Sequence, residues 1–223
     1  MTEKNSAYYR GIARGNLQNN WGTAIVVGLI IFGISFLSGL ANIIPLVGSV
    51  VSIVISGPLM VAELRYFIAL NKKEKATVGT AFTNFGKDFS GNVGAYILQS
   101  IYTFLWMLLF VIPGIIKSYA YSMTMFLKSK NPEMKAVDAI DLSQKIMDGK
   151  KAKLFCLDFS FIGWAILSVL TLGIGFIFLL PYMSASHVAF YEEAYIEYQA
   201  KIGNIVDADT TKTDDDENQI EVE

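Results

Sequence analysis

Residues 15–62 read GNLQNNWGTAIVVGLIIFGISFLSGLANIIPLVGSVVSIVISGPLMVA, which is 48 consecutive positions without an Asp, Glu, Lys or Arg. An α-helix needs about 20 apolar residues to cross the hydrocarbon core of a bilayer, which is about 30 Å thick. The run is long enough for two such helices joined by a short turn at Asn42 and Pro45. Soluble domains, in which about a quarter of the residues are charged, do not sustain such gaps. The stretch therefore predicts an integral membrane protein.

Two further gaps in the charge pattern support the same conclusion. No charged residue stands in the 28 positions between Asp88 and Lys117, or in the 33 positions between Asp158 and Glu192. Over all 223 residues, 53% are apolar and only 17% are charged. We expect an all-α membrane bundle of about six transmembrane helices in three hairpins, at residues 21–40, 47–70, 93–112, from a turn at 113–114 to 128, 154–171 and 176–195.

Gly57–Pro58 interrupts the second predicted segment. Proline lacks the backbone N–H and its ring clashes with the preceding turn, so a kink or a break of the helix is expected here. Unwound backbone survives in a bilayer only where it is buried in protein or lines a watered cavity. The pair therefore marks a position where a polar site could form.

The chain divides into three parts by composition. Residues 1–20 form a polar cytoplasmic leader helix, residues 21–198 the membrane domain, and residues 199–223 an acidic tail with too few apolar groups to pack, which we expect to be disordered. Residues 131–149 differ from the rest of the membrane domain. Asn131 resembles an N-cap and Pro132 a first helical residue, and apolar and charged side chains then take opposite faces. We expect an amphipathic cytoplasmic helix on the membrane surface or packed under the bundle.

The basic residues predict the orientation in the membrane. They gather in the leader and in the connections near residues 72–87 and 128–153, whereas the alternate connections carry almost none. Because basic residues accumulate on the cytoplasmic side, both termini are expected in the cytoplasm. The protein would be a multi-pass protein of the cell (cytoplasmic) membrane.

Glu63 and Arg65 are the most informative polar residues of the predicted spans. An ionisable group inside a spanning segment costs several kcal/mol unless it is paired or hydrated, so each is a functional candidate. One hypothesis places them in a ligand-binding vestibule beside Gly57–Pro58, with His187 as a further member. The alternative is that Arg65 extends to the membrane surface and Glu63 pairs with a neighbouring helix.

Three other polar side chains are better explained by structural roles. His187 has no partner at metal-ligand spacing and is expected to be a hydrogen-bonded histidine of the bundle. Asp158 is expected near a helix N-terminus, facing the lysines before it. Cys156 is expected to be a small buried apolar residue. The sequence contains no catalytic motif and predicts no metal, no cofactor and no enzyme activity.

Lys150, Lys151 and Lys153 form a basic cluster directly before a predicted span. Their place beside the membrane favours contact with anionic lipid headgroups over nucleic acid. The expected partners are therefore the lipid bilayer and its anionic headgroups, with a membrane protein or a second copy of the chain as further possibilities.

The chain resembles a family of bacterial multi-pass membrane proteins known as domain of unknown function 975. The resemblance rests on stretches spread over residues 7–195. They are Asn20-Trp21-Gly22, residues 112–119 (IPGIIKSY), Asn131-Pro132-Glu133 with Ser143, Met147 and Gly149, residues 157–164 (LDFSFIGW), Gly173, Gly175, Pro181-Tyr182 and Phe190-Tyr191-Glu192. Asn19 departs from the glycine usual before the Asn-Trp pair. The resemblance implies a cytoplasmic-membrane protein and supplies no catalytic or binding residue.

Three functions remain open at this point. The first is a non-enzymatic accessory, scaffold or envelope protein of the membrane. The second is a small transporter or permease with a cytoplasm-facing polar site at Glu63, Arg65 and His187. The third is a membrane enzyme acting on lipid, which would need a cluster of reactive side chains that the sequence does not reveal.

Overall fold

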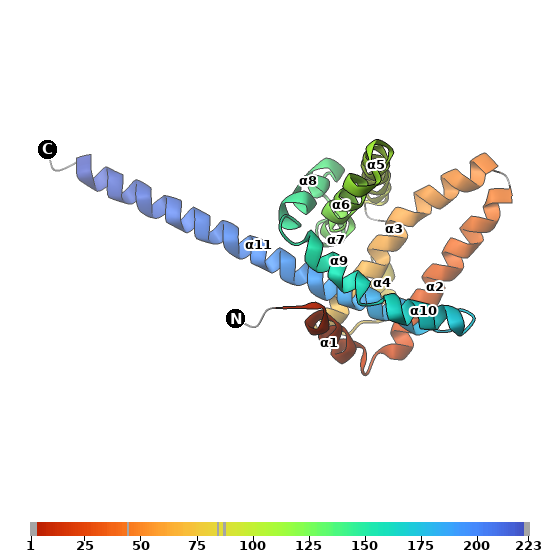
Figure 1. The fold of residues 1–223 in the computed structure, drawn as a ribbon. Coiled ribbons are helices and arrows are strands. Elements are labelled where there is room, and N and C mark those ends of the chain that lie inside the picture. The colour runs from red at the N-terminus through yellow and green to blue at the C-terminus, as the bar shows by residue number, and fades with distance from the viewer. Residues whose placement is uncertain (1–3, 44, 84, 87, 221–223) are drawn as a thin grey trace.

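The computed structural model describes residues 4–43, 45–83, 85–86 and 88–220, with side chains up to Gly203 apart from a few positions near residues 42–47. All regular elements of these residues are helical (Figure 1). They are α1 (Ser6–Leu17), α2 (Trp21–Leu40), the 3-10 turn η1 (Ala41–Ile43), α3 (Pro45–Asn71), α4 (Val78–Phe82), α5 (Phe89–Leu109), α6 (Val111–Tyr121), α7 (Thr124–Lys130), α8 (Ala136–Ile146), α9 (Lys151–Phe159), α10 (Ile162–Leu170) and α11 (Phe176–Ile220). The all-α prediction is confirmed.

Three of the contacts between consecutive helices join the predicted hairpins: α2 with α3, α5 with α6, and α10 with α11. One close approach within these pairs is at Gly114 of α6, where a Cβ atom would lie 2.7 Å from the Cα of Met107. Only a glycine permits that distance, so the two helices can fold back on each other directly. In Figure 1, α2 and α3 extend together away from the remaining helices.

Four segments of the described chain are long and apolar enough to cross a membrane: Trp21–Leu40, Gly48–Asn71, Phe89–Leu109 and Lys151–Leu170. The last of these comprises α9 and α10, with a turn at Ser160 and Phe161 between them. The fourth and sixth predicted spans are not among the four. α6 has 11 residues and is about 16 Å long at 1.5 Å per residue, which is half of a bilayer core. In α11, Ser, Tyr, His and Glu residues stand between the apolar ones and lower the mean hydropathy of the helix.

Buried and exposed apolar residues occupy different parts of the molecule. We call residues 9–17, 59–70, 120–128, 139–147 and 185–194 the base, because nearly all of the large buried side chains lie there or directly beside it. We call residues 29–53, 101–116 and 162–180, which contain the ends of the three helix pairs, the arms. The arms expose large apolar side chains, with Ile43 85%, Leu108 73% and Leu172 95% exposed.

Within the predicted leader, Ser6–Leu17 form α1, which packs on the base. Its buried residues Tyr9, Ala13 and Leu17 recur every four positions and form one apolar stripe. The stripe lies against α11, where the rings of Tyr9 and Phe190 are 5.2 Å apart. The first and last helices of the chain are therefore neighbours (Figure 1).

Two local predictions differ from the structure. α3 passes through Gly57–Pro58 without a break, so that alternative is wrong, while the kink stays a prediction. Gly57 is explained instead by a helix crossing, because a Cβ there would lie 2.6 Å from the carbonyl oxygen of Asn92 in α5. The turn expected at Pro113 occurs earlier, at Phe110, whose extended backbone separates α5 from α6. Pro113 then fits the first turn of α6, where its missing N–H costs nothing.

The amphipathic helix is shorter than the predicted 131–149. α8 begins at Ala136, because Asn131 serves as the C-cap of α7 and not as an N-cap. Its face is as predicted, with Ala139, Ile140 and Ile146 buried. α8 packs against α5 and α7, so of the two placements considered the structure supports packing within the bundle.

Candidate functional site

Glu63 of α3 faces α11. Its carboxylate accepts a hydrogen bond of 2.6 Å from the hydroxyl of Ser184. Glu63 follows the buried Val61 and Ala62, and the last turns of α3 pack on α11. The carboxylate is therefore held inside the bundle by a neutral hydroxyl. This agrees with the alternative in which Glu63 pairs with a neighbouring helix.

His187 lies one turn after Ser184 on the same face of α11. Its Nε2 is 2.6 Å from Oδ1 of Asp158 in α9. The second oxygen of Asp158 accepts a hydrogen bond of 2.8 Å from the hydroxyl of Tyr119 in α6. His187 is a hydrogen-bonded bundle histidine, as predicted, whereas Asp158 faces His187 and Tyr119 and not the lysines.

We call Glu63, Ser184, His187, Asp158 and Tyr119 the polar junction. Its members come from α3, α6, α9 and α11, so each of the three helix pairs contributes at least one of them. Asp158 comes from α9, the helix that precedes the α10–α11 pair. Tyr119, Asp158 and Ser184 each lie within four residues of an arm, at the border with the base. The side chains of Asp158 and His187 are 30% and 26% exposed, so this part of the junction is only partly buried.

Arg65 is not part of the polar junction. Its Nη1 donates a hydrogen bond of 2.8 Å to the carbonyl oxygen of Thr83, in the connection that follows α4. Residues two apart on a helix point to different sides, which explains why Glu63 and Arg65 separate. Of the three predicted ligand-binding residues, the structure brings Glu63 and His187 together and leaves Arg65 outside.

The predicted headgroup lysines differ in their surroundings. Lys150 donates to a carboxylate oxygen of Glu197 at 2.6 Å and to the carbonyl of Ala194 at 3.2 Å. Lys151 lies 3.7 Å from the carboxylate of Asp148, and Lys153 is exposed. The hydrogen bond from Lys150 holds the pKa of the Glu197 carboxyl below its ordinary value. Contact of these lysines with lipid stays a prediction.

Lys128 is the polar residue whose role the sequence did not reveal. Its side chain is 1% exposed, and its ammonium group pairs with the carboxylate of Asp88. It also donates to the carbonyl oxygens of Pro132 and Met134, at 2.5 and 2.8 Å. All three ammonium protons therefore have acceptors, which is the condition for burying a lysine.

Metal binding has no support in the part of the chain that is described. No group of three or more His, Cys, Asp or Glu side chains is close enough there to hold an ion. Cys156 is exposed, so the prediction that it is buried is wrong. Its neighbours Leu154 and Leu157 take the buried positions of α9.

The model of the family described as "Protein of unknown function (DUF975)" matches residues 1–116 and 107–196. The chain belongs to this family. The suspected resemblance is thereby confirmed over both halves of the membrane domain. No curated protein and no solved structure matches the chain.

Two members of the polar junction lie in stretches that carried the DUF975 resemblance. Tyr119 ends the stretch IPGIIKSY and Asp158 is the second residue of LDFSFIGW. These stretches were a signal by which both residues could have been found. Ser184 had no such signal, because a serine in an apolar helix is ordinary in membrane proteins.

Proposed function

We propose that this DUF975 member is a multi-pass protein of the cytoplasmic membrane with six crossings in three hairpins and both termini in the cytoplasm. Four described segments have the length and composition of spans. The exposed apolar side chains of the arms need a hydrocarbon solvent, since in water they would drive aggregation. The basic connections near residues 72–87 and 128–153 give the orientation.

Within that membrane protein we propose the activity of a small permease that moves its solute together with a proton. The observation that carries the proposal is the polar junction, in which Glu63 and His187 lie on facing helices at the meeting point of the helix pairs. Buried ionisable groups are expensive in a membrane and mark proton relays or ion paths.

The junction supplies two proton sites with different partners. The Glu63 carboxylate has the hydroxyl of Ser184 as its hydrogen-bond partner. Nε2 of His187 lies 2.6 Å from Oδ1 of Asp158, which fixes the orientation of the ring. Ser184 and His187 share a face of α11, so a change in either proton site shifts the contact of α11 with α3 or α9.

A second candidate is the accessory or scaffold protein. It is favoured by the fact that Glu63, His187, Asp158 and Tyr119 all have partners within the chain. Such a network can fasten helix pairs together without binding a solute. Neither candidate makes the protein an enzyme, and we retain that prediction as part of the proposal.

Proton flux distinguishes the two candidates. Purified protein in liposomes with a trapped pH dye should dissipate an imposed pH gradient when a small-molecule extract of cells is added outside, because a coupled permease moves its proton only with its solute. Glu63→Gln should slow this by at least tenfold because the site can no longer exchange a proton. Arg65→Lys is the matched control, since it keeps the charge and lies outside the polar junction; it should retain the rate. Equal rates for protein-free, wild-type and Glu63→Gln liposomes, with both proteins folded, would refute the permease and leave the scaffold.

The orientation has its own test. In a Cys156→Ser background, single cysteines at Lys73 and Lys151 should react with a membrane-impermeant thiol reagent only after the cells are opened. Labelling of either position in sealed cells would contradict the topology, whatever the result of the flux measurement.

A further inference from the structure

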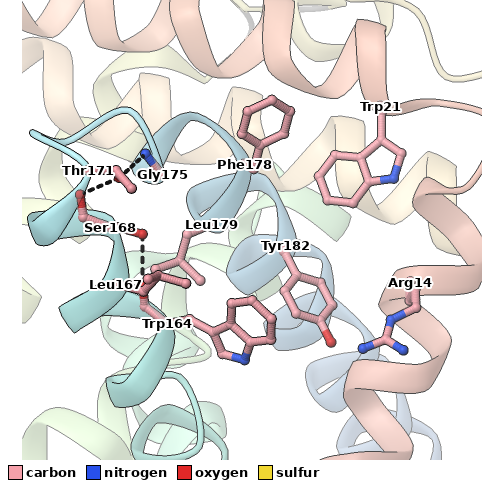
Figure 2. Close-up of a pocket in the computed structure, with 10 residues that line it drawn as sticks. All are labelled: Arg14, Trp21, Trp164, Leu167, Ser168, Thr171, Gly175, Phe178, Leu179 and Tyr182. Atoms are coloured by element: carbon pink, nitrogen blue, oxygen red, sulfur yellow. Dashed lines mark hydrogen bonds between the residues drawn. The ribbon is translucent and has the colours of Figure 1, made fainter.

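A second site is suggested by an apolar pocket between the start of α2 and the α10–α11 pair. Figure 2 shows its lining, in which the large aromatic side chains of Trp21, Trp164, Phe178 and Tyr182 surround the space. The pocket has a volume of about 340 Å³, within the range of roughly 300–1,000 Å³ typical of small-molecule sites. It does not include any residue of the polar junction.

The two ends of the pocket differ in chemistry. Arg14 of α1 lines one end, and the turn formed by Ser168, Thr171 and Gly175 lines the other (Figure 2). The hydroxyls of Ser168 and Thr171 are bound to carbonyls of their own turn, so that end offers no free donor to a ligand. Charge is therefore presented at one end only, by a cation.

The cationic end lacks a counter-ion among the residues that the structure describes. No acidic side chain lines the pocket, and Arg14 forms no ion pair there. Arg10 lies one turn earlier on α1, and its buried Nε has no hydrogen-bond partner. Tyr182, which lines the pocket, donates from its hydroxyl to the backbone carbonyl oxygen of Arg10 at 3.4 Å.

The walls of the pocket belong to the parts of the chain that lie in the hydrocarbon. Trp21 begins one candidate span, and Trp164 and Leu167 belong to another. Leu167 and Phe178 are 51% and 53% exposed, so the pocket is open toward the surrounding lipid. A ligand that suits it has an anionic group for the arginine end and an apolar tail for the aromatic walls.

We propose that this pocket binds an anionic phospholipid, with the phosphate at Arg14 and one acyl chain along Trp21, Trp164 and Phe178. An acyl chain fits because the lining is apolar along its length, and the anionic headgroup neutralises the guanidinium group of Arg14. This site is separate from the proposed proton site, and each can fail without the other.

Tryptophan quenching tests the proposal. Two of the three tryptophans line the pocket, so Trp106→Phe leaves only the reporters Trp21 and Trp164. This variant is placed in phosphatidylcholine vesicles that contain a small fraction of either dibrominated phosphatidylglycerol or dibrominated phosphatidylcholine. The anionic quencher should be more effective. Arg14→Gln should weaken this preference about fivefold, the effect of one basic residue near an anionic headgroup, and Arg14→Lys should restore most of it.

Lys75→Gln is the matched control, because it removes an equal charge from an exposed position away from the pocket; it should leave the preference unchanged. Equal quenching by both lipids would mean ordinary contact with surrounding lipid and would overturn the site. A preference that survives Arg14→Gln would overturn the assignment of the headgroup end. Relief of quenching by soluble inorganic phosphate would show a free-anion site and overturn the lipid as ligand.

Discussion

The base buries its large apolar side chains, whereas the arms expose theirs. In the base, Tyr66, Phe126 and Phe190 are buried against neighbouring helices, and the buried Lys128 forms an ion pair with Asp88. In the arms, Phe36, Leu108 and Leu170 point outward, and no Asp, Glu, Lys or Arg interrupts residues 29–53 or 101–116. One chain thus follows the rule for water in one region and the rule for lipid in the other.

The comparison shows what holds each region together. The base excludes water from its own interior, so the hydrophobic effect and satisfied polar groups stabilise it. Lipid is as apolar as the arm side chains, so the arms gain nothing from burying them. Close backbone packing must take over there, as at Gly114 against Met107.

The largest expected effect is at the buried cation of the base. Lys128→Met leaves the carboxylate of Asp88 and two carbonyl oxygens without their donor. Removing one partner of a buried ion pair costs about 3–5 kcal/mol, so the melting temperature in detergent should fall by roughly 10 °C. Lys75→Met, at an exposed position, should change it little. A silent Lys128→Met would mean that the base does not depend on this burial.

A smaller effect is expected where the base meets the arms. Gly57→Ala places a Cβ 2.6 Å from the carbonyl of Asn92 and 3.0 Å from the Cβ of Tyr96. Overpacking of this kind costs about 1–3 kcal/mol, visible as a lower midpoint in denaturant. Gly33→Ala in the first arm meets nothing within 4 Å; it should be neutral or stabilising, since alanine favours helix. An equal loss of stability in Gly57→Ala and Gly33→Ala would contradict the distinction between a closely packed and an open helix surface.

The smallest effect is expected at the rim of the base. Lys150 lowers the pKa of Glu197, so the pair stabilises the fold above the ordinary glutamate pKa of about 4.3 and this contribution is lost as pH falls through the folded value. The side chain of Glu197 is 50% exposed, and exposed pairs contribute under about 1 kcal/mol. Glu197→Gln should lower the melting temperature slightly at pH 7 and not at pH 3. A larger loss at pH 3 would reverse the sign of this argument.

The sequence predicted the long apolar helices α2, α3 and α5. The expected 21–40 agrees with α2, and 47–70 and 93–112 lie within a few residues of α3 and α5. Suitability for lipid is a property of each segment's own composition, so it can be read locally. The start of α8 could not, because Asn131 and Pro132 suit the end of one helix as well as the start of the next.

The polar junction was predicted only in part, for a different reason. Glu63 and His187 were singled out because each is a polar group in an apolar segment. Their partners depend on which helices become neighbours, and Glu63 and Ser184 are 121 positions apart. The residues around Glu63 give no indication that its partner is Ser184 of α11.

The contact of α1 with α11 sets an order of events during synthesis. Tyr9 and the Glu193 carboxylate that it binds are 184 residues apart, so at about 5–20 residues per second the leader helix waits roughly 10–40 s for its partner. During that interval the face formed by Tyr9, Ala13 and Leu17 is uncovered, and the bilayer surface or a chaperone has to shield it. A chain that terminates before Phe190 never covers this face, and we expect the cell's proteases to remove it.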